Sequence, residues 1–537
     1  MTTDFQYIPP GLSPELNALT LDEVCQHYKT HYSCFELDEF LGAYFFNRFA
    51  ADEKLAKHSE AITCFVHLVK CLHKIDPFNA SVGNVMQQIA PSPALKMRLK
   101  ILSHLTPNAS FMQSVERLVS AGNPDKARAR LLRELSANAG NVYLGIALYE
   151  MDLEQGNSSH DWLPSFTPHA ELKPLWSQRL AYLAARAGRA EEALTYLPTL
   201  PVPDCNNEFL LNALAISSLS LKDTDTASAL LETSLQIAPS QKPIRLLRDE
   251  LAKPFAVIPN AFAGRNIVIA IYSYNKADLL KQTLDSLRAS NIGSARCIVL
   301  LNGCTDHSQQ VVEEAKSLFM TTQLESIVLP VNVGAPAARN YIVQHALSDE
   351  KTELVAFLDD DVTIDKEWLA ALVTAIDEDP QIGAVGCKVT NPGNNTLQYL
   401  YRDVSIARPG LFRLSLSTPL HTLDNGLYNV RKDVDSIMGC CHLIRRECLE
   451  KLPEFDIRFS PSQLDDVAFH LDLRLLGYKV RYVGQVTCCH YRSTGFASQS
   501  RASYGNSLGN DVKFYYRFEN SLPTFKNWQV TRNNYPL

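Results

Sequence analysis

The 537-residue sequence lacks several features that define common classes of protein. No apolar run approaches the length of a membrane span, and the N-terminus carries neither a basic leader nor an apolar core. We therefore expect a cytoplasmic protein that is at most peripheral to a membrane. With 51 Lys and Arg against 58 Asp and Glu, the formal net charge is −7, which gives no reason to expect a nucleic-acid partner.

Paired cysteine spacings are also lacking. The 13 cysteines show no C-x-x-C pair, which indicates reduced thiols rather than a disulfide framework. The vicinal pairs Cys440-Cys441 and Cys488-Cys489, with His442 and His490 beside them, suggest zinc at first sight. Vicinal cysteines bind one metal poorly, so we do not expect a zinc site.

The first half of the chain, residues 1–250, reads as an all-α domain. Leu and Ala recur at helical spacing, and no convincing strand interrupts them. Gly122, Gly156 and Gly188 lie 34 and 32 positions apart, and Lys222 follows another 34 positions later. This weak period resembles a tetratricopeptide array. Such arrays stack helical hairpins and often bind proteins or peptides, so we expect a partner surface here, or else a spacer or oligomerisation surface.

The second half changes character after a linker at 251–264, where Pro254, Pro259 and Gly264 break the helical pattern. Apolar runs of strand length then alternate with amphipathic segments, which predicts an α/β fold with a mainly parallel sheet between helices. The first strand is followed by no glycine-rich turn, and no P-loop is present, which excludes dinucleotide-binding and P-loop proteins. The expected strands are Ile267–Tyr272, Cys297–Leu301, Ser326–Leu329 and Leu354–Leu358, and the clearest helices are Ala335–Leu347 and one capped by Asp365.

The fourth expected strand ends in three consecutive carboxylates, Asp359, Asp360 and Asp361. A run of charge is commonly only a solvated surface, but ligands of open α/β sheets bind at the carboxyl ends of the strands. Neighbouring carboxylates repel one another, so a hard divalent cation with phosphate oxygens is their natural partner. This stretch predicts a metal and diphosphate site.

Further segments on either side of these carboxylates carry a resemblance. They are Ile269–Asn275, Leu301–Asp306, Asn332–Asn340, Met438–Arg446, Asp465–Asp466 and His490. In this order they resemble the opening strand, the Asp-Asn-Gly-Ser-Thr-Asp loop, the Asn-x-Gly-x-x-x-Ala-Arg-Asn segment, the loop before the acceptor site, the Glu-Asp pair and the late histidine of the family 2 glycosyltransferases. Asp359–Asp361 falls on their metal-binding Asp-x-Asp. The resemblance covers 265–492 as a catalytic domain of the GT-A fold, and 493–537 follows as a C-terminal extension or lid.

The resemblance implies a metal-dependent inverting enzyme that transfers a sugar from a nucleotide-sugar donor to a hydroxyl of a protein or glycan. The helical half would recruit the acceptor or a partner. A divalent cation, Mn²⁺ or Mg²⁺, would be held by Asp361 and His490. Asp466, or else Asp465, would be the base that takes the acceptor proton. The residues implied on the donor side are Ser273, Tyr274, Asn275, Asn302, Gly334, Arg339, Asp359 and Asp360.

One departure from the family pattern keeps alternatives open. The family usually carries an aspartate that binds the nucleobase of the donor, and this position is Leu301 here, with Asn302 beside it. A uridine nucleotide is therefore not implied. A non-catalytic helical-repeat scaffold with a degenerate transferase domain is the alternative that this departure favours. A nucleotidyltransferase would also place carboxylates at strand ends, although it would usually present a glycine-rich loop near its start. Arg339 would either contact the diphosphate or brace the carboxylates.

Overall fold

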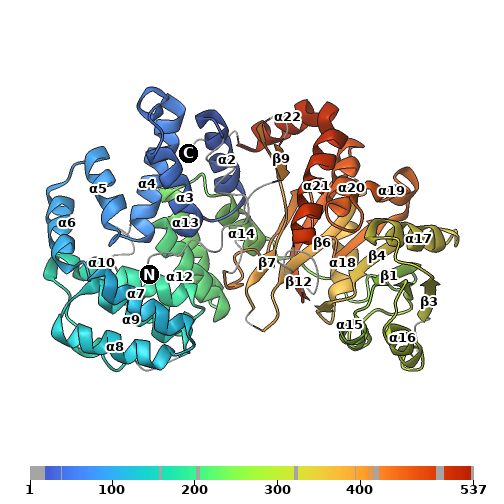
Figure 1. Ribbon diagram of the computed structural model, residues 1–537, viewed down its shortest axis with the longest axis horizontal. Helices are drawn as coiled ribbons and strands as arrows, with labels where there is room; N and C mark the ends of the chain where they lie inside the picture. The colour runs from blue at the N-terminus through green and yellow to red at the C-terminus, as the bar shows by residue number, and fades with distance from the viewer. Residues whose placement is uncertain are drawn as a thin grey trace. The chain divides into compact units, whose positions relative to one another are not determined.

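The computed structural model separates into two compact units, the first ending at Arg248 and the second beginning at Asp249 (Figure 1). It describes residues 19–37, 39–156, 160–200, 206–319, 324–393, 395–408, 411–414, 422–491 and 501–533. Parts of the predicted extension or lid, 493–500 and 534–537, therefore lie outside the described residues. Within the described ranges, no helix is long and apolar enough to cross a membrane.

The first unit is helical throughout its described residues, which confirms the predicted all-α region. Its longer helices, the last of which runs across the boundary into the second unit, are α2 (Leu21–Cys34), α3 (Glu39–Ala50), α4 (Ser59–Ile75), α5 (Ala80–Ile89), α6 (Pro93–Leu105), α7 (Ala109–Ser120), α8 (Pro124–Ala137), α9 (Val142–Glu154), α10 (Lys173–Arg186), α11 (Ala190–Thr195), α12 (Glu208–Ser220), α13 (Thr224–Ile237) and α14 (Lys242–Ala252). Short 3₁₀ turns lie between some of them.

The residues that set the predicted repeat share one backbone conformation. Gly122, Gly156 and Gly188 have φ of 72°, 71° and 74°, and Lys222 has φ of 65°. Each follows a helix within two residues, at α7, α9, α10 and α12. A left-handed residue ends a helix by turning the chain back, and glycine adopts this conformation without steric cost. The period therefore marks helix ends, while the assignment to the tetratricopeptide family remains a prediction.

The second unit is an α/β structure around one large sheet. Its strands are β1 (Ile267–Ser273), β2 (Arg296–Asn302), β3 (Leu324–Leu329), β4 (Leu354–Asp359), β5 (Val362–Ile364), β6 (Ile382–Thr390), β7 (Leu397–Tyr399), β10 (Arg431–Val434), β11 (Cys441–Arg445) and β12 (Lys479–His490), with β8 (Val404–Arg408) and β9 (Leu411–Leu414) forming a separate hairpin. Its helices are α15 (Ala277–Ala289), α16 (Ser308–Lys316), α17 (Ala335–Leu347), α18 (Trp368–Ile376), α19 (Arg446–Lys451), α20 (Asp465–Leu475), α21 (Arg501–Phe518) and α22 (Leu522–Asn533).

The strand order shows how the expected parallel sheet is extended. Along the main path the order is β10-β12-β6-β11-β4-β1-β2-β3. The four strands expected from the sequence, β1 to β4, are parallel neighbours as predicted. β11 lies antiparallel between β4 and β6, and β12 lies parallel to β6, so the far half of the sheet is mixed. The predicted α/β fold is confirmed, with a more mixed sheet than the βα alternation alone indicates.

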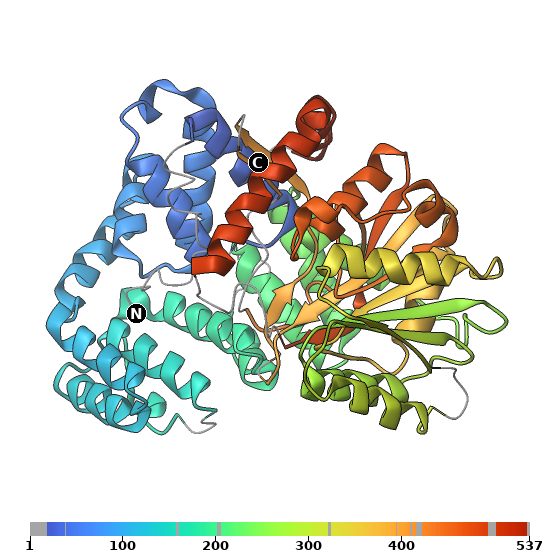
Figure 2. The same ribbon diagram turned by 45° about the vertical axis from the view of Figure 1, so that its right-hand side comes forward.

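Helices cover both faces of this sheet. Ile267, Ile269 and Ile271 of β1 belong to a core that also contains residues of α15, α16 and α18. The other face carries Phe357 of β4, whose ring lies 5.5 Å from that of Phe455. Helices α17 and α20 lie on this second face, and Figure 2 shows α17 in yellow running along it. Successive side chains of a strand point to opposite faces of the sheet, so each face packs against its own set of helices.

The predicted cap of the helix after β5 is wrong in one respect. The residue before α18 is Glu367, and no side chain caps the helix. Asp365 instead accepts a hydrogen bond from Thr487 N through Oδ2, at 2.7 Å. Its carboxylate therefore ties the loop after β5 to β12, because β12 passes antiparallel to β5 at this point.

The C-terminal helices have a small core of their own. Phe514 and Phe518 of α21 and Phe525 of α22 pack with Val467 and Leu471 of α20. Because α20 begins with the two aspartates singled out in the sequence, its position depends in part on these last helices.

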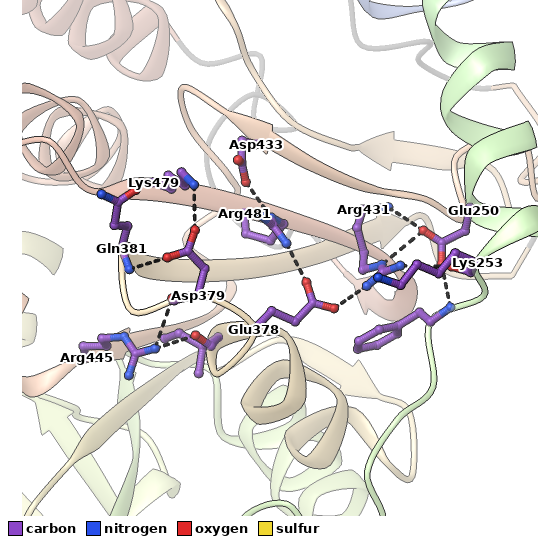
Figure 3. Close-up of polar contacts among 12 residues, drawn as sticks. Glu250, Lys253, Glu378, Asp379, Gln381, Arg431, Asp433, Arg445, Lys479 and Arg481 are labelled. Carbon is purple, nitrogen blue, oxygen red and sulfur yellow. Dashed lines mark hydrogen bonds and ion pairs between the residues drawn. The ribbon is translucent and has the colours of Figure 1, made fainter.

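An ion-pair network lines the edge of the sheet formed by β10 and β12 (Figure 3). Arg431 Nε lies 3.1 Å from Glu250 Oε2, and the same guanidinium pairs with Glu378. Arg481 continues the chain of contacts, with NH1 2.7 Å from Glu378 Oε2 and Nε 2.5 Å from Asp433 Oδ1. Since charges of opposite sign alternate, Arg431, Glu378 and Arg481 each have charged partners on two sides, and the end of α14 at Glu250 is held to the sheet edge.

Candidate active site

The three consecutive carboxylates lie where the central parallel strands end. β4 pairs with β1 so that Asp359 is opposite Tyr272, and the Tyr272 hydroxyl donates to Asp359 Oδ1 at 3.2 Å. On the other side of β4, Asp359 N donates to Cys440 O at 3.0 Å. These contacts fix the strand end from both neighbours, so the direction of the Asp359 carboxylate is well defined.

His490 reaches the same place from the end of β12. The short strand β5 pairs antiparallel with β12 so that His490 is opposite Val362, directly after Asp361. His490 Nε2 lies 3.1 Å from Asp361 Oδ1 and 3.9 Å from Asp359 Oδ2. One ligand atom from each of Asp359, Asp361 and His490 lies within 4.8 Å of the others. The structure thus brings together the two residues predicted to hold the metal and adds Asp359 to them.

This donor set fits a divalent cation such as Mn²⁺ or Mg²⁺. Two of the three donors are carboxylate oxygens, the hard ligands that Mn²⁺ and Mg²⁺ prefer. Asp361 and His490 are buried and Asp359 is partly exposed, so the group has an open side. An open side is what a cation needs if it is also to contact a phosphate.

Lys276 is a member of the site that the sequence did not predict. Its Nζ lies 2.9 Å from Asp360 Oδ1 and 2.9 Å from Asp361 Oδ2. Burial alone would lower the pKa of Lys276, but the two carboxylates raise it above its usual value. Burial raises the pKa of Asp360 to about 6 against the effect of Lys276. Lys276 directly follows the Tyr272–Asn275 turn. Its position next to the predicted donor residues is the feature of the sequence from which a place in the site could have been predicted.

The pKa of Asp361 shows how strongly its charge is favoured. Burial would raise that pKa, but the hydrogen bond and charge of His490, together with Lys276, hold it well below its usual range. Asp361 is therefore ionised at neutral pH. An ionised carboxylate beside a histidine is ready to accept a metal cation.

Arg339 lies inside the protein and joins the two halves of the site. Arg339 is only 4% exposed, and its guanidinium pairs with Asp465 and lies 3.5 Å from Asp359 Oδ1. It also lies over the rings of Tyr272 and Phe455, at 5.0 and 5.6 Å from their centroids. Of the two roles considered for Arg339, these contacts correspond to bracing the carboxylates.

The two aspartates at the start of α20 have different surroundings. Asp465 is 2% exposed and paired with Arg339, and burial raises its pKa even though Arg339 opposes the effect. Asp466 is less buried, and its Oδ2 accepts a hydrogen bond from Gly439 N at 2.8 Å. Gln463 and Leu464, just before them, have φ of 83° and 69°, a strained backbone that is concentrated at functional sites.

Gly439 is needed where it contacts Asp466. A Cβ at this position would lie 2.6 Å from Asp466 Oδ2 and 2.8 Å from its Cβ. Such distances are too short for any side chain, so only glycine allows this approach. Gly439 lies within the segment Met438–Arg446 that was singled out, but its contact with Asp466 depends on the fold of two separate loops.

The remaining predicted donor residues lie at the ends of β1 and β2. Ser273 is buried at the end of β1, and Tyr274 is 46% exposed just beyond it. Asn275 Oδ1 accepts from Thr305 N at 2.7 Å, which ties the turn after β1 to the loop after β2. These residues border the same edge of the sheet as Asp359, because the strands are parallel.

Asn302 is occupied in holding the loop before α17. Its Nδ2 donates to Asn332 Oδ1 at 2.9 Å, and its Oδ1 accepts from Val333 N at 2.9 Å. Gly334 begins α17 with φ of 85°, and a Cβ there would lie 2.8 Å from Ser460 Oγ. Both residues therefore shape the loop between the donor side and α20.

The cysteines group differently from the vicinal pairs in the sequence. Cys387, Cys441 and Cys488 come from three strands and place their sulfurs within 4.8 Å of one another in the core. His442 Nδ1 instead lies 3.2 Å from His470 Nε2, and His490 is with the carboxylates. Neither histidine joins the three thiols.

Comparison with known proteins identifies a family for part of the second unit. Residues 268–452 match the family described as Glycosyl transferase family 2. The second unit therefore carries a family 2 glycosyltransferase domain, with the α/β fold expected of the GT-A class. Asp465, Asp466 and His490 lie beyond the matched segment.

Among curated proteins, the chain is similar to the O-antigen biosynthesis protein RfbC of Myxococcus xanthus. The two are 28% identical over 227 residues, which are 41% of this chain and 17% of that protein. The chain thus matches less than a fifth of the length of this relative.

Solved glycosyltransferases are more distant. The mannosyltransferase PcManGT from Pyrobaculum calidifontis, in complex with GDP-Man and Mn²⁺, has 20% identity and a TM-score of 0.35, covering 53% of this chain and 71% of that one. GalNAc-T7 with UDP, GalNAc and Mn²⁺ has 16% identity and a TM-score of 0.34, covering 42% of this chain and 44% of that one.

Proposed function

We propose that the second unit transfers a sugar from a nucleoside-diphosphate donor to an acceptor hydroxyl, with inversion at the anomeric carbon. The observation that carries this proposal is the grouping of Asp359, Asp361 and His490 at the end of β4, joined to Asp465 through Arg339. A site for a cation and a pair of candidate bases are thus linked by one buried residue.

In the proposed reaction, Asp466 takes the proton of the acceptor hydroxyl. The acceptor oxygen attacks the anomeric carbon while the bond from that carbon to the diphosphate oxygen breaks. A divalent cation held by Asp361 and His490, with Asp359 beside them, would neutralise the negative charge of the leaving diphosphate. We favour Asp466 over Asp465 as the base because Asp465 is paired with Arg339, whereas Asp466 is more exposed.

Other residues hold these groups in place. Gly439 N donates to Asp466 Oδ2 and Val467 N donates to Asp466 Oδ1, each at 2.8 Å, so both oxygens of this carboxylate are held in place. Lys276 offsets the charge of Asp360 and Asp361, so that the carboxylates can lie close together before a substrate binds. Ser273, Tyr274, Asn275, Asn302 and Gly334 would form the donor side of the site.

For the acceptor, we propose a glycan in preference to a protein. The relative RfbC is named for O-antigen biosynthesis, which is the assembly of a glycan. The helical unit would then recruit the acceptor or a partner protein. A protein acceptor remains the alternative, because helical arrays of this kind often bind polypeptides.

The decisive experiment is a panel of nucleotide sugars assayed for release of the nucleoside diphosphate, with Mn²⁺ or Mg²⁺ present. We expect turnover of at least one donor, which a chelator stops. Asp361→Ala should abolish turnover, and Asp466→Asn should reduce it by roughly 10²- to 10⁴-fold, the usual contribution of a general base. Unchanged turnover in both variants would contradict the proposal.

A non-catalytic scaffold is the second candidate, and Leu301 is the observation that favours it. Leu301 is buried in the core, at the position where the family carries the aspartate that binds the nucleobase of the donor. Thermal unfolding with a panel of nucleoside diphosphates separates the two candidates. An enzyme should be stabilised by a nucleotide only when the metal is present, whereas a scaffold should show no such dependence.

A further inference from the structure

We propose that Gln398 is a positioning residue that selects the tautomer and the ring orientation of His490 for binding a divalent cation. This inference rests on the proposed function, because the cation belongs to the same site. Gln398 lies within the residues that match the family but in none of the motifs singled out in the sequence, and it lies on the three-residue strand β7.

The fold places Gln398 against the last residue of β12. β7 pairs with the end of β6, and β6 runs parallel to β12 as far as Cys489. Gln398 is 1% exposed, so its amide has no access to water. Its Oε1 lies 2.7 Å from His490 Nδ1, and its Nε2 donates to His490 O at 2.7 Å. Both ends of one side chain thus contact the same histidine.

The orientation of the Gln398 amide follows from its partners. A main-chain carbonyl can only accept a hydrogen bond, so the NH₂ group must face His490 O. The same Nε2 lies 3.0 Å from Asn391 Oδ1. Asn391 is itself oriented, because its Nδ2 donates to the main-chain oxygen of Leu397 at 3.4 Å, which can only accept, as well as to Thr396 Oγ1 at 2.9 Å. Two acceptors therefore hold the NH₂ end, and Oε1 must face the imidazole ring.

The tautomer of His490 follows in turn. Oε1 of an amide is an acceptor, so the ring nitrogen that faces it, Nδ1, must carry a hydrogen. In the absence of a cation, Nε2 can carry a hydrogen of its own and donate it to Asp361 Oδ1, 3.1 Å away. A cation displaces that hydrogen, and the neutral imidazole then has its only N–H on Nδ1 and its lone pair on Nε2. Nε2 is the atom that lies 3.1 Å from Asp361 Oδ1 and 3.9 Å from Asp359 Oδ2. The lone pair therefore points to the place where the two carboxylates would share a cation.

This arrangement is the amide counterpart of the carbonyl and carboxylate partners that orient metal-binding histidines in other proteins. Loss of such a partner typically lowers metal affinity by about 10- to 100-fold. We expect a loss of this size here, because His490 would keep its place on β12 but its ring could rotate or adopt the other tautomer.

The test is the affinity of the full-length protein for Mn²⁺, measured by isothermal titration calorimetry without nucleotide. Gln398→Met keeps a side chain of similar length and removes every hydrogen bond, and it should raise the Kd by about 10- to 100-fold. Gln398→Glu keeps an acceptor for Nδ1–H and should bind more tightly than Gln398→Met. A matched control is Gln241→Met, which removes a buried amide bonded to Asn212 and Ser234 in the first unit and should leave the Kd unchanged.

A spectroscopic signature separates orientation from a general loss of structure. Pulsed electron paramagnetic resonance of bound Mn²⁺ detects the ¹⁴N of a directly bound histidine. The wild-type protein should show this coupling and His490→Ala should lack it. Gln398→Met should show a weakened coupling and Gln398→Glu should retain it. Circular dichroism checks that the variants fold, and if Gln398→Met does not, retention or loss of the coupling in Gln398→Glu decides the question.

The outcomes distinguish this inference from the proposed function. If Asp361→Ala binds Mn²⁺ as well as the wild type, the metal site itself is wrong. If Asp361→Ala abolishes binding but Gln398→Met keeps both the wild-type Kd and the ¹⁴N coupling, the metal site stands and the role of Gln398 is overturned. Loss of the coupling in a folded Gln398→Glu variant would also overturn it.

Discussion

Replacing Arg339 with methionine should destabilise the second unit by about 3–5 kcal/mol, the usual cost of removing one partner from a buried ion pair. Arg339 is 4% exposed, and its partner Asp465 is 2% exposed, so water cannot replace the lost contact. Methionine has a similar length and keeps the apolar packing against Tyr272 and Phe455. The expected loss therefore reports the uncompensated carboxylates rather than a cavity.

Amide hydrogen exchange in peptides from β1 and β4 measures this change within the second unit alone. A loss of about 3–5 kcal/mol corresponds to exchange that is faster by roughly 10²- to 10³·⁵-fold, if these amides exchange through opening of the whole unit. The destabilisation should be smaller at pH 5 than at pH 8. Burial already raises the pKa of Asp465, and without Arg339 its carboxyl would take up a proton as the pH falls.

The double variant Arg339→Met/Asp465→Asn supplies the control. It removes both charges, so most of the lost stability should return, because replacing both partners is far less costly than leaving one. The reasoning is refuted if Arg339→Met changes the opening free energy by less than about 1 kcal/mol, the value expected of an exposed pair. A double variant no more stable than Arg339→Met would refute it as well.

Three further predictions follow from other contacts. Gly439→Ala should lower kcat by about 10²-fold, because its Cβ would displace Asp466 by an ångström or so, and the Kd for Mn²⁺ should stay unchanged in the same preparation. Lys276→Met should lower the melting temperature of the metal-free protein, and added Mn²⁺ should raise it by more than in the wild type, since Asp360 and Asp361 have lost their counter-charge; an equal shift would contradict this. Burial lowers the pKa of His27 and of His67 to about 4, so the folded first unit binds fewer protons than the unfolded chain. Its stability should be full above pH 6.5 and fall toward pH 4, by about 2 kcal/mol per histidine at pH 5, and urea unfolding at several pH values should show a smaller slope for His67→Gln.

The parts of the fold that local pattern determines were predictable. The helix expected at Ala335–Leu347 has those limits in the structure, because Gly334 precedes it as the N-cap residue and Pro336 lies in its first turn. The strand ending in Asp359 was equally clear, since five apolar residues precede the charge. Asp361 and His490 were paired through a family resemblance, and the β5–β12 register shows how the chain brings them together.

The contacts that support the site were not predictable in the same way. Gln398 lies on a strand of three residues, which is too short to show any period. Gly439 gains its importance only because α20 passes close to it. The antiparallel direction of β11 between β4 and β6 is also determined by tertiary contacts, because nothing in the segment itself sets that direction. Local sequence thus indicates where the charged groups lie, and long-range pairing decides what holds them.

The packing of α21 and α22 on α20 also bears on the order in which the protein matures during synthesis. Val467 and Leu471 of α20 are covered by Phe514, Phe518 and Phe525, which are translated after them. Until these leave the ribosome, the helix that begins with Asp465 and Asp466 has an exposed apolar face. A nascent chain complete to the end of β12 would therefore contain every proposed metal ligand and base, and yet would be prone to aggregate and slow to become active.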